Sequence, residues 1–131
     1  MKVHNFTPQD GIQARAHRKE NNFQQQLTLV AVYKRELVEI AQLRIYGTKA
    51  ANYACLWVND RKTQMYCSGS GKASGYGYHR PSEAVRDAFN SAGIYLNQDI
   101  SGRGEQAINE ALTALGKKLG YRKTNIIEAH G

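Results

Sequence analysis

The stretch that sets the fold is Leu27-Thr28-Leu29-Val30-Ala31-Val32-Tyr33-Lys34, which is rich in β-branched and large apolar side chains. Leu27, Leu29 and Ala31 alternate with the residues between them, and a period of two places such residues on one side of a strand. The run ends at the charged residues Lys34-Arg35-Glu36. It therefore predicts a first β-strand over residues 27–34.

Three more segments continue this pattern, at residues 37–46, 53–58 and 63–67. A helix over Arg35–Leu43 competes with the second of the four strands, but its β-branched residues favour a strand. Asn59-Asp60 supplies turn-forming side chains between the third and fourth strands. Four neighbouring strands with short links predict an antiparallel meander.

Two amphipathic helices and a last strand follow. Ser82 and Glu83 are suited to the start of a helix that Gly93 ends, with Ser82 expected to cap its free amides. A second helix is expected over residues 105–119, stopped by Gly120, and a strand over residues 124–128. The predicted fold is α+β: an antiparallel sheet of four or five strands, followed by two helices packed on one face.

Length and composition predict one domain, at 131 residues with 41% hydrophobic and 22% charged residues. Residues 1–26 are expected to form a flexible or partly helical arm, and residues 27–131 the domain. No apolar run reaches the length of a membrane span and the start does not resemble a signal peptide. We therefore expect a cytoplasmic protein with free thiols at Cys55 and Cys67. A small sheet leaves its second face partly exposed, so a homodimer or higher homo-oligomer is expected.

The sequence contains no strong catalytic or metal-binding pattern. Its four histidines and two cysteines lack metal-ligand spacing, and its acidic residues are scattered singly. Cys67 or a loop serine could be a nucleophile near His79, but neither lies in a recognisable motif. His79 itself could transfer a proton. We expect a protein that is not an enzyme, with no cofactor and no metal.

The glycine-rich segment Cys67–Pro81 is the most informative part of the chain. It fits neither the Walker pattern, because Ala73 follows Lys72, nor the dinucleotide pattern. Glycines nevertheless allow close approach to a ligand, and a helix N-terminus offers free amides to an anion. Tyr76 and Tyr78 could stack on a base. The alternative is a long connection whose tyrosines pack on the sheet.

A second loop, Asp99–Gly104, places Arg103 between two glycines ahead of the second helix. If the two helices lie side by side, both N-termini could serve one site, where Arg103 would bind a phosphate. The alternative is an ordinary exposed arginine. The aromatic residues of the strands are expected to line the core or a subunit contact, or to stack on bases: Tyr33, Tyr46, Tyr53, Trp57 and Tyr66.

The chain from Leu27 to Glu128 resembles the Thoeris anti-defence family of phage proteins, which sequester cyclic ADP-ribose signals. The resemblance lies in size, in a sheet that precedes C-terminal helices, and in Gly75–Tyr78, Arg86 and Gly102–Gly104. It implies a homo-oligomer that binds nucleotide signals in the cytoplasm of a bacterial host.

The net charge of +7 also favours an anionic partner. The expected function is non-catalytic sequestration of an anionic nucleotide messenger, of the cyclic ADP-ribose type or a cyclic oligonucleotide, which blocks a bacterial immune response. The alternative is an inhibitor of a host defence nuclease that binds nucleic acid or protein; a small enzyme using His79 is a third class. The expected ligand-binding residues are Lys72, Tyr76, Tyr78, His79, Arg80, Arg86 and Arg103.

Overall fold

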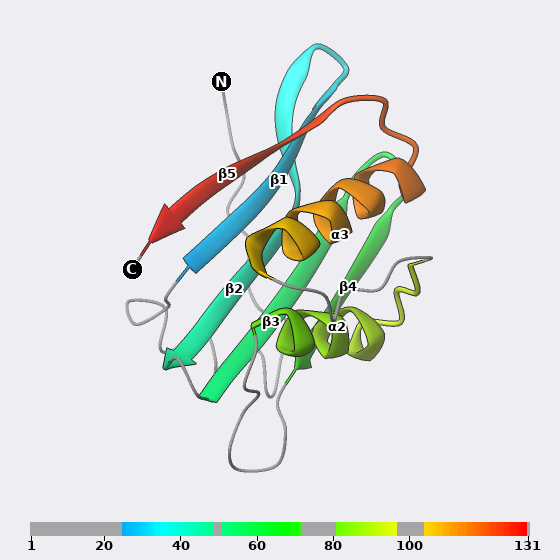
Figure 1. The fold of residues 1–131 in the computed structure, drawn as a ribbon. Helices are drawn as coiled ribbons and strands as arrows, with labels where there is room; N and C mark the ends of the chain where they lie inside the picture. The colour runs from blue at the N-terminus through cyan, green and yellow to red at the C-terminus, as the bar shows by residue number, and fades with distance from the viewer. Residues whose placement is uncertain (1–24, 49–50, 72–80, 97–103, 131) are drawn as a thin grey trace.

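The computed structural model describes residues 25–48, 51–71, 81–96 and 104–130 (Figure 1). The elements in chain order are β1 (Gln25–Tyr33), β2 (Glu36–Thr48), β3 (Ala51–Asp60), β4 (Met65–Gly71), α2 (Pro81–Ser91), α3 (Gly104–Lys118) and β5 (Thr124–His130). This is the expected order of four strands, two helices and a strand. Most strand boundaries differ from the prediction by one or two residues, and the largest difference is at the end of β4, which continues past Cys67 to Gly71.

The strands form one antiparallel sheet of five strands in the order β4-β3-β2-β1-β5. The first four are joined in sequence order, and β5 returns after the helices to pair with β1. Both helices lie on the same face of the sheet (Figure 1). α2 packs against β3 and β4, and α3 lies nearer β1 and β5. The predicted α+β architecture is therefore confirmed.

Tight turns set the register of the meander. Between β1 and β2, Lys34 and Arg35 have φ values of 50° and 68°. Two successive residues with positive φ are characteristic of the turns whose twist matches that of the flanking strands. Such turns usually contain Asn-Gly, and this one has Lys34-Arg35 instead, so the hairpin lacks its usual sequence signal.

Asp60 organises the turn between β3 and β4, as the Asn59-Asp60 pair predicted. Its Oδ2 accepts hydrogen bonds from the Thr63 amide at 3.1 Å and from the Thr63 hydroxyl at 2.5 Å. The Tyr121 hydroxyl donates to the other carboxylate oxygen, and Asp60 is fully buried. Burial and this bond to Asp60 raise the pKa of Tyr121. One carboxylate thus joins the turn to the segment that follows α3.

Both helices end as the sequence predicted, at Gly93 and Gly120. These glycines have φ values of 79° and 89°, a conformation that costs little without a Cβ. In each case the glycine amide bonds three residues back and the next amide bonds five residues back. That is the Schellman motif, which satisfies carbonyls that the helix end leaves free.

Alternation along the strands gives the sheet two chemically different faces. The helix face, toward α2 and α3, includes the paired row Leu27, Leu43 and Leu56, all buried in the main core with Phe89 and Leu112. The opposite face, called here the far face, includes the adjacent row Thr28, Gln42 and Trp57. Apolar side chains thus build the helix face, and polar and aromatic side chains build the middle of the far face.

Gly69 and Gly71 correct the interpretation of the glycine-rich segment as a loop from Cys67 onward. Both lie in β4 on the helix face, opposite Leu56 and Ala54. A Cβ on Gly69 would lie 2.3 Å from the carbonyl oxygen of Ala88, and one on Gly71 would lie 1.8 Å from that of Ala84. These two glycines therefore serve the close approach of α2 to the sheet, and not the approach of a ligand.

Cys55 and Cys67 are free, as expected. They lie on neighbouring strands but on opposite faces, since Cys55 pairs with Ser70 on the far face and Cys67 with Val58 on the helix face. In the part of the chain that the structure describes, no helix is both long enough and apolar enough to cross a membrane.

Candidate functional site

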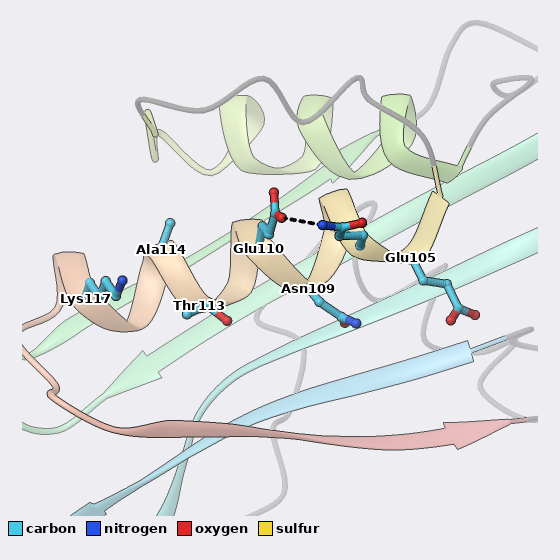
Figure 2. Close-up of a pocket in the computed structure, with 7 residues that line it drawn as sticks. Glu105, Asn109, Glu110, Thr113, Ala114 and Lys117 are labelled. Carbon is cyan, nitrogen blue, oxygen red and sulfur yellow. Dashed lines mark hydrogen bonds between the residues drawn. The ribbon is translucent and has the colours of Figure 1, made fainter.

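The two helices run in the same direction along the sheet. Figure 1 shows this by the colour gradient, and Figure 2 shows Glu105 at one end of α3 and Lys117 at the other, with α2 alongside. The first residues of α2 and α3, Pro81 and Gly104, therefore lie at the same end of the helical layer. Helix N-termini carry unpaired amides and a partial positive charge. Because the two N-termini lie at the same end, their positive potentials add there. The condition for a shared site, that the helices lie side by side, is met.

Ser82 does not cap α2, contrary to the prediction. It is the second residue of the helix, and its side chain is fully buried. Its Oγ has no hydrogen-bond partner in the described part of the chain. A capping residue must precede the helix, and Ser82 comes too late for that role. The first turn of α2 therefore holds a buried hydroxyl.

Of the seven expected ligand-binding residues, Arg86 lies among the described residues. It occupies the second turn of α2, is partly exposed, and its Nε donates to Asp87 Oδ1 at 3.1 Å. A phosphate would have to compete with Asp87 for this guanidinium. The other six residues lie outside the described ranges, in the segments that precede α2 and α3: Lys72, Tyr76, Tyr78, His79, Arg80 and Arg103.

Carboxylates also stand at the shared end. Glu83 lies in the first turn of α2 and Glu105 in the first turn of α3. Each stabilises the positive end of its own helix dipole. An anionic ligand at this end would therefore depend on cations from the preceding segments to offset both glutamates.

A depression of about 510 Å³ lies on the outer side of α3 (Figure 2). Its side chains splay away from one another: Glu105 and Asn109 point to one side of the helix and Glu110 to the other. Gln106 Nε2 donates to Glu110 Oε1 at 3.0 Å. Two glutamates against the single cation Lys117 do not suit an anion, so this depression is not the expected nucleotide site.

A second group of functional side chains lies in the middle of the far face. The far-face cluster consists of Glu39, Gln42, Arg44, Tyr46, Cys55 and Trp57, all buried. Glu39, Gln42 and Arg44 were not predicted as site residues, because alternating polar residues in a strand usually face solvent. Of the aromatic residues expected to line a core or contact, Tyr46 and Trp57 belong to this cluster, and Tyr33 packs against the main core.

The contacts within the far-face cluster are specific. Arg44 Nε donates to Gln26 Oε1 at 2.7 Å, and its guanidinium carbon lies 5.7 Å from the centroid of the Trp57 ring. Burial raises the pKa of Glu39 from 4.5 to about 7. Burial also raises the pKa of Cys55 to about 12, although Arg44 opposes this rise. Both shifts follow from the low exposure of these side chains, since burial disfavours the charged form of a carboxyl or a thiol.

Comparison with known proteins gives no relative. No family model, no curated protein and no solved structure matches the chain. The class of architecture is α+β, with two helices on one face of a five-stranded antiparallel sheet.

Proposed function

We propose that this protein is a non-catalytic binding protein that sequesters an anionic nucleotide messenger at the shared N-terminal end of α2 and α3. The messenger is of the cyclic ADP-ribose type or a cyclic oligonucleotide. Its capture would lower the free concentration of a bacterial immune signal.

The observation that carries the proposal is the common direction of the two helices (Figures 1 and 2). Two sets of free amides at one end suit a ligand with two phosphates. The segment before each helix contains glycine and arginine, and the first also contains Tyr76 and Tyr78 for stacking on a base. Arg80 and Arg103 would bind the phosphates, with Lys72 as a third cation.

Thermal unfolding with a panel of cyclic nucleotides and cyclic ADP-ribose isomers tests the proposal. A ligand present at 100 times its Kd stabilises the folded state by about 2.7 kcal/mol. In a domain of this size that corresponds to a rise in Tm of roughly 10 °C. No rise with any member of the panel at millimolar concentration would refute the proposal.

The site is tested with paired arginine variants. Arg103→Ala should abolish the ligand-induced rise in Tm, because it removes a phosphate contact. Arg122→Ala is the matched control, since Arg122 is an exposed arginine just beyond the opposite end of α3. Equal loss in both variants would show that only net charge matters. In that case binding to a short RNA or DNA should fall steeply with salt, as the alternative function requires.

A further inference from the structure

The middle of the far face is buried, yet both described helices lie on the other side of the sheet (Figure 1). Trp57 is 3% exposed and Cys55 is 2% exposed. Neighbouring side chains such as Arg44 contribute some of this burial, but a flat row of residues on a sheet cannot remove a tryptophan from water without a covering layer. The burial of Trp57 therefore points to a further layer over these residues.

The cover is narrow, because apolar side chains at the rim of the same face remain exposed. Val32 at the tip of the β1–β2 hairpin is 66% exposed, Tyr66 on β4 is 57% exposed, and Ile127 on β5 is 47% exposed. Burial is thus concentrated on β1, β2 and β3. A single segment crossing the three middle strands fits this distribution better than a second sheet would.

We infer that residues 1–24 dock across the middle of the far face and cover the far-face cluster. The other segments outside the described ranges are less suitable. Residues 72–80 and 97–103 each lead into a helix, and both helices lie on the opposite face of the sheet, while residues 49–50 are the short link between β2 and β3. Residues 1–24 lead directly into β1, a strand of the covered region, and 24 residues can span many times the width of three strands.

The chemistry of residues 1–24 matches that of the face. They contain two of the three phenylalanines of the chain, Phe6 and Phe23, together with Ile12. These side chains would pack against the aromatic rings of the cluster.

The polar groups match as well. Residues 1–24 carry four basic side chains (Lys2, Arg15, Arg18 and Lys19) against two acidic ones (Asp10 and Glu20), a net charge of +2. Two buried acceptors of the cluster, Glu39 Oε2 and Gln42 Oε1, have no hydrogen-bond partner within the described ranges. Backbone and side-chain amide N–H groups of the segment can donate to these two oxygens without placing a cation beside Glu39.

Trp57 is the single tryptophan of the chain, so quenching of its fluorescence measures how far the covering segment shields it from solvent. In the unmodified chain, acrylamide should quench this fluorescence poorly. Replacing the two phenylalanines and the isoleucine of the segment should raise quenching severalfold: Phe6→Ser, Ile12→Ser and Phe23→Ser. A matched triple variant at polar residues of the same segment should leave the quenching of Trp57 unchanged: Gln9→Ser, Gln13→Ser and Asn22→Ser.

A variant that keeps its circular dichroism spectrum and still protects Trp57 as the wild type does would overturn the inference. So would protection that disappears on dilution of the wild type, because a second copy of the chain would then be the cover.

A second measurement leaves the apolar residues in place, in case the triple variant does not fold. In a Cys67→Ser chain, a nitroxide quencher is attached at Thr7→Cys or Gln13→Cys, while Cys55 stays unlabelled because it is buried. At least one of the two labels should quench Trp57. A label at Lys118→Cys, exposed on the opposite side of the sheet, should not. Absence of quenching from both labels in residues 1–24 refutes the docking.

Discussion

Replacing Glu39 with glutamine should stabilise the protein, and the gain should depend on pH. Glu39 is buried on the far face, and Oε2 of its carboxylate has no hydrogen-bond partner among the described residues. A charge in such surroundings loses its hydration without compensation. Glutamine has nearly the same shape and no charge, so Glu39→Gln isolates the electrostatic cost.

The magnitude follows from the pKa of Glu39, which burial raises from 4.5 to about 7. Each pKa unit corresponds to about 1.4 kcal/mol, so the ionised carboxylate costs roughly 3 kcal/mol in the folded state. Between pH 4.5 and 7 the folded protein holds a proton that the unfolded chain has released. The stability contributed by Glu39 is therefore present below pH 4.5, is lost as the pH rises to about 7, and stays constant above it.

Urea unfolding of the wild type and the variant at pH 5, 6, 7 and 8 measures the difference. At pH 8 the variant should be more stable by up to about 3 kcal/mol, and at pH 5 the difference should fall to about 1 kcal/mol or less. The matched control is Glu36→Gln, because Glu36 is an exposed glutamate at the start of the same strand. A stabilisation by Glu39→Gln that is the same at all four pH values would refute the reasoning.

Three other predictions concern the core and its borders. Gly71→Ala should destabilise the protein by about 3 kcal/mol or more in urea unfolding, because its Cβ would overlap the carbonyl of Ala84. Tyr121→Phe should cost about 1–3 kcal/mol by the same assay, because it removes a hydrogen bond from the buried carboxylate of Asp60. In a chain whose other cysteine is serine, Cys55 should react with Ellman's reagent at pH 8 only after unfolding, since burial raises its pKa to about 12.

The sequence was sufficient to predict the fold class and most of the element boundaries. Alternation in residues 27–34 predicted β1, and the glycines after each amphipathic stretch, Gly93 and Gly120, marked the ends of α2 and α3. These signals are local, since a strand or a helix end is specified by residues close together in the chain. Such local patterns predict an element correctly when tertiary contacts do not override them.

The end of β4 could not be predicted because its cause is tertiary. The sequence Ser68-Gly69-Ser70-Gly71 has low β-propensity and therefore predicts a loop. The glycines are required by the backbone of α2, which passes within contact distance of the strand. Only their alternation, at positions 69 and 71 on one face, hinted at a strand. Half of the four glycines that suggested a ligand loop therefore have a packing role.

The far-face cluster escaped prediction for a related reason. Glu39, Gln42 and Arg44 alternate with apolar residues, a pattern that normally indicates a sheet with one solvent-exposed face and one buried face. The pattern is correct for an isolated sheet, and their burial depends on a covering segment that the strand itself does not specify. The raised pKa of Glu39 could not be predicted from the strand sequence either, because it arises from burial by tertiary contacts.

The common direction of α2 and α3 has a physical cause that the sequence does contain. Residues 92–103 link the end of α2 to the start of α3, a distance of twelve residues along the chain. Helices joined by a short loop are usually antiparallel neighbours. A parallel neighbour requires the chain to return along a helix of 15 residues, about 22 Å at 1.5 Å per residue. Twelve residues can cover that distance, since an extended chain spans about 3.3 Å per residue. The length of this link therefore permits two helix N-termini at one end of the sheet. The proposed nucleotide site depends on that arrangement more than on the number of glycines before α2.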